Sequence, residues 1–202
     1  MKKLIYLLTV YSIALLSSNY AISSEGGDEF KVNTKNSKIN WLGTKPGGEH
    51  NGTVKIKDGI LSLKNGELTG GNFVIDLNSI ENLDLDSETW NKKLVDHLKS
   101  EDFFYVGKYP TAVFTITEVE KIEPYNYKIT GDLKLRGITK TIHFKANVSI
   151  ENDILKASTP KFVLDRTQWK IEAMSKSIFA DIKDRYVDDE MQIEIELVAD
   201  RE

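Results

Sequence analysis

Residues 139–150 read TKTIHFKANVSI, and this stretch decides the class of fold. From Ile142 to Ile150 every second residue is apolar, and the residues between them are polar or charged. A period of two is typical of a β-strand with one buried face and one solvated face. The same alternation recurs at 127–135 and 190–199. Such one-sided strands favour an antiparallel sheet over a doubly wound parallel one, so we expect an all-β protein.

Outward from this stretch, the alternation predicts eight strands, at roughly 37–45, 50–63, 66–77, 111–121, 126–136, 139–150, 154–165 and 189–200. Turn dipeptides separate several of them: Asn65-Gly66, Arg136-Gly137 and Asn152-Asp153. The apolar positions change face at Asp58-Gly59 and at Gly70-Gly71, which predicts β-bulges that bend two long strands. Eight bent antiparallel strands favour a closed barrel, and a flat two-sheet sandwich is the alternative.

One helix interrupts the strands, between the third and the fourth. Asp86 or Ser87 can cap it, Thr89–Lys99 forms its body, and Leu94, Val95 and Leu98 make a narrow apolar stripe. A second short turn is expected to begin at Ser100 and to end in Phe103-Phe104. We expect this segment to cover one end of the barrel. The long connection 168–189 covers the same end or the other.

The first residues have the layout of a secretory signal peptide. Lys2 and Lys3 precede an uncharged apolar run from Leu4 to Leu16, which is shorter than the about 20 residues of a membrane-spanning helix. We assign 1–21 to the signal peptide, with cleavage between 18 and 24, and 22–29 to a disordered leader. The protein is therefore expected to be exported, to the periplasm in a Gram-negative host, with no stable membrane insertion.

Composition excludes several functional classes. The chain has no cysteine, which excludes disulfides, thiol catalysis and a lipidated-cysteine anchor. Its formal net charge is −4, so a nucleic-acid partner, which requires a basic surface, is not expected. Its three histidines share no metal-ligand spacing, and no nucleophile elbow, phosphate loop or His-Glu-x-x-His motif occurs. We therefore expect no metal, no cofactor and no enzymatic activity.

Several motifs resemble those of the YceI-like family. They are DHLKSEDFF at 96–104, KYPT at 108–111 with Phe114, TGDLKLRGITK at 130–140, WLGTK at 41–45, GEHNG at 48–52 and DRTQW at 165–169. The resemblance covers essentially the whole mature chain, so 30–202 reads as one YceI-like β-barrel domain. It implies an eight-stranded antiparallel lipocalin-like barrel that holds a long isoprenoid or another amphiphile in its lumen.

The chain departs from the family pattern at three places. The family often has an arginine where Lys92 or Lys93 stands, and a small residue where Lys170 stands. Its usual Gly-Ser-Gly stretch is replaced here by MSKS at 174–177. These positions lie in loops within reach of a head group, so the polar end of the ligand stays open.

The candidate site residues fall into two sets. The first set is apolar and is expected to line the lumen: Trp41, Phe73, Ile75, Phe103, Phe104, Phe114, Ile129, Leu133, Phe144, Phe162 and Trp169. For any one of these residues, ordinary barrel core is the alternative. The second set is expected near the barrel rim, where it would meet a head group: Arg166, Lys45, His50 and Lys99. The alternative for Arg166 is a structural network with Asp165.

These residues favour a carrier or store for a hydrophobic molecule. A tail of a dozen carbons would gain roughly 10 kcal/mol gross on burial, before ordering costs reduce that figure. The competing hypothesis is a filled barrel that binds another envelope protein through its loops. An enzyme acting on lipids is the third.

Overall fold

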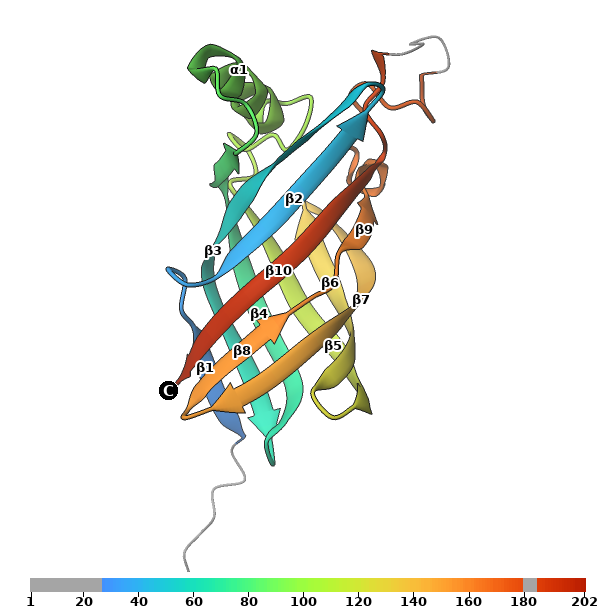
Figure 1. Ribbon diagram of the computed structural model, residues 1–202. Helices are drawn as coiled ribbons and strands as arrows, with labels where there is room; N and C mark the ends of the chain where they lie inside the picture. The colour runs from blue at the N-terminus through green and yellow to red at the C-terminus, as the bar shows by residue number, and fades with distance from the viewer. Residues whose placement is uncertain (1–26, 180–184) are drawn as a thin grey trace, which may run out of the picture.

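The computed structural model describes residues 27–179 and 185–202, and almost all of its regular structure is strand (Figure 1). The strands are β1 (Asp28–Val32), β2 (Lys38–Lys45), β3 (Gly48–Lys64), β4 (Glu67–Asn82), β5 (Thr111–Glu123), β6 (Asn126–Leu135), β7 (Ile138–Glu151), β8 (Ile154–Ser158), β9 (Phe162–Asp165) and β10 (Glu190–Arg201). The helix α1 (Glu88–Lys99) lies between β4 and β5, and a 3-10 turn, η1 (Arg166–Trp169), follows β9.

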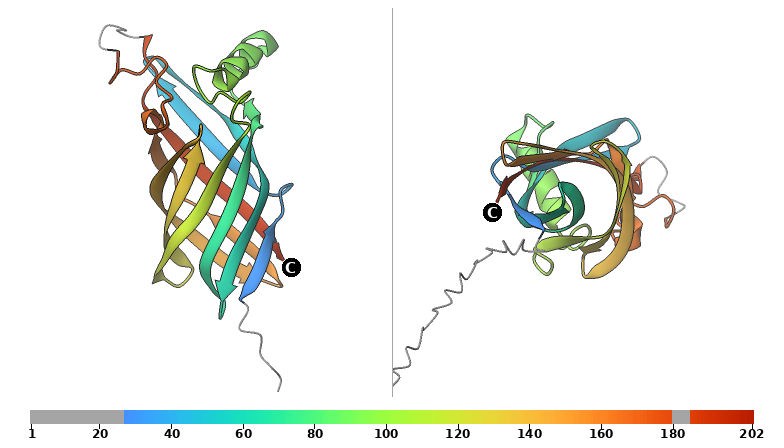
Figure 2. Two further views of the ribbon diagram at one scale, coloured as in Figure 1. Left: turned by 180° about the vertical axis from the view of Figure 1, so that it is seen from behind. Right: turned by 90° about the horizontal axis from the view of Figure 1, so that it is seen from below.

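The strands close into a ring of eight positions, all paired antiparallel. Two positions are each shared by two short strands: β1 and β2 both lie between β3 and β10, whereas β8 and β9 both pair with β10. The view along the barrel in Figure 2 shows this ring. The predicted all-β, lipocalin-like barrel with one helical segment is confirmed, and the sandwich alternative is wrong.

Two predicted strand boundaries are corrected. The predicted strand 154–165 is two strands, because Thr159–Lys161 leave the ladder at Pro160, a residue without an N–H to donate. Thr159 instead exchanges two hydrogen bonds with Ile195 on β10, one through its hydroxyl and one through its main chain. In addition, β1 begins at Asp28, inside the expected leader. Residues 22–26 of that leader and the expected signal peptide lie outside the described residues.

The bends in the long strands fall close to the predicted glycines. The β3–β4 register shifts between Ile56 and Asp58, and again opposite Gly70. The predicted hairpin turn at Asn65-Gly66 also forms, with φ of 54° and 78° at the two residues. Positive φ at both central positions matches the twist of a two-residue hairpin. The register shifts let β3 and β4 curve around the barrel, and the tight turn joins them as a hairpin.

The two ends of the barrel differ. At the end remote from α1, β1 pairs with the last residues of β10, and Phe30, Leu63 and Leu155 are almost completely buried there. At the other end lie α1, the turns that follow it, and the segment after η1 (Figure 1). The described parts of the 168–189 connection, residues 168–179 and 185–189, are therefore at the same end as the helical segment, which is one of the two placements expected. We call this the α1 end.

Candidate ligand-binding cavity

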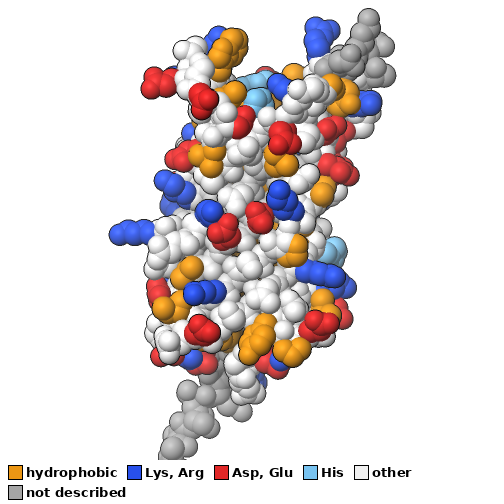
Figure 3. Space-filling view, viewed as in Figure 1, with side chains coloured by type: hydrophobic (Ala, Val, Ile, Leu, Met, Phe, Trp, Pro, Cys, Tyr) orange, Lys and Arg blue, Asp and Glu red, His pale blue; other side chains and the backbone are white. Residues whose placement is uncertain are grey.

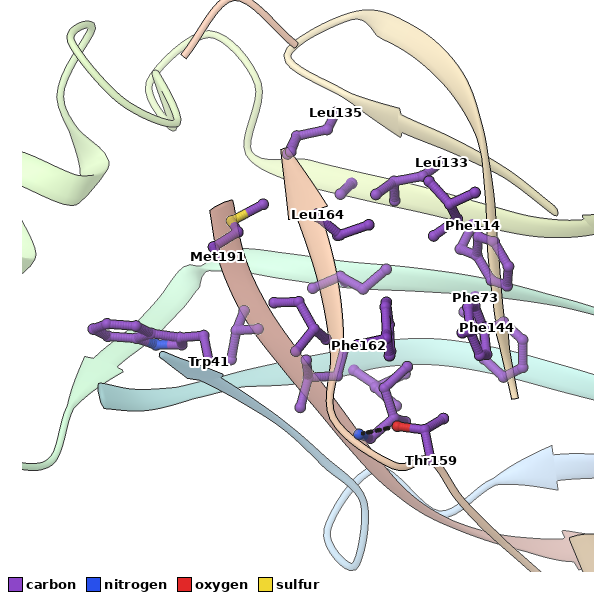
Figure 4. Close-up of a pocket in the computed structure, with 18 of the residues that line it drawn as sticks. Trp41, Phe73, Phe114, Leu133, Leu135, Phe144, Thr159, Phe162, Leu164 and Met191 are labelled. Carbon is purple, nitrogen blue, oxygen red and sulfur yellow. Dashed lines mark hydrogen bonds between the residues drawn. The ribbon is translucent and has the colours of Figure 1, made fainter. Parts of the chain in front are cut away.

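A cavity of about 250 Å³ lies inside the barrel (Figure 4). Side chains from β2 to β10 face it, because alternate residues of each strand point inward. On β10, for example, Met191, Ile193, Ile195 and Leu197 line it. Its polar lining residues are few: Ser158, Thr159, Arg166, Asp188 and Glu190. Such a wall favours a hydrocarbon over a polar ligand.

The predicted lumen residues line the cavity, with one exception; most come from the alternation of the strands, and Phe103 and Phe104 come from the turns after α1. The following line the cavity: Trp41, Phe73, Ile75, Phe103, Phe104, Phe114, Ile129, Leu133, Phe144 and Phe162. Trp169 does not line it. Its ring is fully buried beside the wall, and its Nε1–H donates a hydrogen bond of 3.1 Å to the main-chain oxygen of Leu133. The prediction for Trp169 is therefore corrected from lumen to core.

Four phenylalanines form a row of ring contacts along the inner wall. Phe73 contacts Phe114 with 6.3 Å between ring centroids, and Phe114 contacts Phe144 at 5.5 Å. Phe144 in turn stacks on Phe162 at 4.7 Å. In Figure 4, Trp41 lies at one end of the drawn set, and Phe73, Phe114 and Phe144 lie at the other. The cavity wall therefore carries a row of phenylalanine rings, and the indole of Trp41 lies nearer the α1 end.

Arg166 is buried, and its donors are used within the protein. They reach the main-chain oxygens of Asp188 (3.0 Å), Ile171 (2.6 Å) and Val187 (2.9 Å), and the carboxylate of Asp189 (3.3 Å). Burial lowers the pKa of the guanidinium from its ordinary value, against the charges of nearby carboxylates such as Asp189. Arg166 thus holds Ile171 and residues 187–189 on the barrel. This arrangement favours the structural role that the sequence left as the alternative to head-group binding.

The other three head-group candidates lie outside the cavity. The Nζ of Lys99 donates a hydrogen bond of 2.7 Å to the main-chain oxygen of Asn78. Lys45 and His50 lie instead in a second cavity of about 360 Å³ beside α1, here called the α1 cleft. Its lining residues are Lys45, His50, Leu85, Trp90, Lys93, Leu94 and His97. His50 Nδ1 lies 2.8 Å from the carboxylate of Asp84, which orients its ring.

Sequence reasoning missed the aromatic residue of this cleft. Trp90, Leu94 and Leu98 follow at intervals of four, so they share one face of α1. The predicted stripe contained Leu94 and Leu98 but not Trp90. Extending the same spacing by one turn toward the helix start would have found it.

Within residues 27–179 and 185–202, no group of three or more His, Cys, Asp or Glu side chains is arranged to hold a metal ion. Within the same ranges, no helix is both long and apolar enough to cross a bilayer.

Comparison with known proteins gives one consistent result. The family model of the YceI-like domain matches residues 30–199. Protein YceI of Escherichia coli O157:H7 is 32% identical over 162 residues, which cover 76% of each chain. A UPF0312 protein of Pectobacterium atrosepticum is 30% identical over 161 residues, again 76% of each chain.

Solved structures share the barrel at lower identity. Burkholderia cenocepacia BcnA superposes with a TM-score of 0.64 at 19% identity, covering 83% of this chain and 99% of that one. A structure described as a polyisoprenoid binding domain from Saccharophagus degradans has a TM-score of 0.63 at 14% identity, covering 86% and 98%. At these identities the likeness establishes the fold alone.

Proposed function

The chain belongs to the YceI-like domain family, and we propose that it holds the apolar tail of an isoprenoid or a similar lipid inside the barrel. The observation that carries the proposal is the apolar cavity within the ring of strands. The structural neighbour described as a polyisoprenoid binding domain supports the same class of ligand. The cavity also weighs against a filled barrel that acts only through protein contacts.

Burial of hydrocarbon supplies the affinity. Each methylene moved from water into the lumen contributes about 0.8 kcal/mol, before the costs of ordering the chain are subtracted. No specific polar contact is needed for a long tail to bind well. The row of phenylalanines from Phe73 to Phe162 offers the tail a continuous apolar surface.

We propose that the polar end of the ligand lies toward α1. The opposite end is filled by Phe30, Leu63 and Leu155, which leaves no room there for a hydrated group. The cations nearest the α1 end that could meet a head group are those of the α1 cleft, Lys45 among them. Arg166 is not among them, because its guanidinium already serves four acceptors.

We further propose that the protein is exported to the cell envelope by its N-terminal signal peptide and acts there as a carrier, store or shield for this lipid. We expect it to perform no covalent chemistry. Carriage, storage and shielding share the same bound state, so one experiment on that state tests all three.

The test is native mass spectrometry of the mature protein after gentle purification, with extraction and identification of what it carries. We expect a reproducible additional mass that an organic solvent releases as a lipid with a long hydrocarbon tail. A ligand-free mass combined with a stable protein partner would instead support the filled-barrel hypothesis. Turnover of an added isoprenoid would support the enzyme hypothesis.

A further inference from the structure

Exposed apolar side chains gather at the α1 end, from two segments that are far apart in sequence. Leu83 and Trp90 stand beside and on α1, with 64% and 60% of their surface exposed. Met174, Ile178 and Phe179 are exposed in the segment after η1. Figure 3 shows hydrophobic side chains on both of these projections, with histidine between them. Grouped exposure of this kind marks an interaction surface.

The exposed face of α1 continues into the barrel. Trp90 and Leu94 line the α1 cleft, and Leu98, one turn further along the same helix face, lines the lumen cavity. We call this face, Trp90–Leu94–Leu98, the α1 track. Leu98 packs against the edge of the core, but no residue of the helix is fully buried, and Trp90 is 60% exposed, so core packing accounts for only one end of the apolar stripe. The track instead forms an apolar path from the protein surface to the cavity.

Lysine and histidine side chains flank the track on the side of the cleft. Lys93 Nζ lies 4.4 Å from the Trp90 ring centroid, and Lys45, His50 and His97 line the same cleft. Tryptophan beside lysine is the composition of a membrane interface, where the ring enters the acyl boundary and the ammonium stays at the head groups.

We propose that the α1 end docks on the surface of a lipid bilayer, and that the ligand's tail passes between bilayer and lumen along the α1 track. The path of the ligand rests on the proposed function; the docking does not. A bilayer fits better than a protein partner because the exposed apolar side chains stand on two separate projections, and because tryptophan lies beside lysine on one of them, as is typical of side chains at a membrane interface.

The charges at this end indicate how docking is driven. The charged side chains of α1 are Lys92, Lys93 and Lys99 against Glu88 and Asp96, an excess of one cation. Lys99 is held by the main-chain oxygen of Asn78, so the helix presents little excess positive charge to anionic lipids. Insertion of apolar side chains is therefore the main attraction, and binding should be nearly insensitive to salt.

Flotation of the full mature protein with vesicles of phosphatidylcholine, and of phosphatidylcholine mixed with phosphatidylglycerol, tests the docking. We expect binding to both at low and high salt. Trp90→Ser and Phe179→Ser should each weaken partitioning about tenfold, because each removes one inserted apolar side chain. The matched controls, Ile122→Ser and Tyr125→Ser, remove exposed apolar groups at the other end and should change nothing.

Three results would overturn the docking: wild-type protein that does not float, α1-end variants that float like the controls, or binding that high salt abolishes. A stable protein partner in place of vesicle binding would count against it in the same way. Because Trp90 and Phe179 do not line the lumen, their variants should still carry the co-purified lipid. If wild type and every variant lacked lipid while wild type still floated, the proposed function would be refuted and the docking would stand.

The rate at which lipid moves from the protein to vesicles tests whether the tail passes along the α1 track. Co-purified lipid should leave Leu94→Gln several-fold more slowly than wild type when empty phosphatidylcholine vesicles are added, as followed by the loss of the bound mass. Val95→Gln is the control, since Val95 is the neighbouring half-buried residue and lines neither cavity. Equal rates in the two variants would refute passage along this helix face.

Discussion

The ring of Phe144 stacks on the ring of Phe162, with 4.7 Å between centroids and 15° between planes, where the wall of the barrel has no backbone ladder. In the described structure β7 pairs with β8 only from Asn147 to Glu151, and β9 pairs only with β10. The part of β7 before Asn147 is therefore in contact with β9 through these two side chains and not through main-chain hydrogen bonds. The same two rings line the cavity, so this contact links the integrity of the wall to ligand binding.

Phe144→Lys should abolish retention of the co-purified lipid. An ammonium in the lumen would have to be desolvated against hydrocarbon, which costs more than the tail gains there. Native mass spectrometry measures the occupancy, and circular dichroism confirms that the variant is folded. His143→Lys is the matched control, because His143 directly precedes Phe144 in β7 and is exposed to solvent. A folded Phe144→Lys protein that still carried lipid would contradict the assignment of this face to the lumen.

Trp169→Phe should lower stability and leave the ligand in place. The substitution keeps a buried aromatic ring but removes the donor to Leu133, leaving a main-chain oxygen without its partner at a cost of about 1–3 kcal/mol. Urea unfolding measures the loss. Lipid occupancy should match wild type, because Trp169 lies outside the cavity lining. Loss of lipid without loss of stability would place the indole in the lumen after all.

The alternation of apolar residues was sufficient to predict the barrel and its inner face. In β7 it identifies Phe144 as inward and His143 as outward, which is how they lie. The periodicity fails where the chain leaves the strands. Trp169 is the last residue of the 3-10 turn η1 and precedes Lys170, whose φ of 60° reverses the chain, so no strand pattern indicates where its side chain points.

Arg166 shows a second limit of sequence reasoning. Its partners Ile171, Val187 and Asp188 contribute main-chain oxygens, and any residue type carries one of those. The sequence therefore shows a cation near a strand end but not the carbonyls that surround it. The short strand β1 was missed for a related reason, since its five residues include Asp28 and Glu29 and its pairing partners lie far along the chain.

Arg166→Lys should destabilise the fold although it keeps the charge. Lysine cannot supply the planar guanidinium fork that reaches several acceptors at once. The main-chain oxygens of Ile171, Val187 and Asp188 would therefore lose their donors. We expect a loss of about 3–5 kcal/mol and faster proteolysis between 170 and 179. Arg201→Lys is the control, because Arg201 bonds Asp28 and Asp153 at the surface, where such pairs contribute little. Equal losses in the two variants would show that Arg166 does not anchor the segment.

Asp189 should make stability fall in acid. Burial works to raise the pKa of this carboxyl, but hydrogen bonds from Ser175 and Ser177 and the charge of Arg166 outweigh burial and lower it below 3.8. A carboxyl with a lowered pKa in the folded state stabilises the protein above the unfolded pKa, and this contribution disappears as pH falls through the folded one. Urea unfolding below about pH 4 should therefore show a steeper loss for wild type than for Asp189→Asn. Asp86→Asn, at an exposed position, should follow the wild-type slope.

Gly131→Ala should change both stability and the length of lipid that fits. A Cβ at this position would lie 2.4 Å from the Phe114 ring and 2.6 Å from the main-chain oxygen of Thr115. The Phe114 ring can turn into the cavity, but the contact with the Thr115 oxygen is relieved only by a local shift of the β5–β6 ladder. We expect the two changes together to cost about 1–3 kcal/mol, as for an overpacked core. We expect the variant to retain a shorter-tailed lipid than wild type, as identified after extraction. Gly70→Ala, whose Cβ would meet nothing within 4 Å, should retain the wild-type lipid at wild-type stability. An unmoved Phe114 ring in a crystal structure of Gly131→Ala, with the wild-type lipid still bound, would show that the space beside this glycine does not set the shape of the lumen.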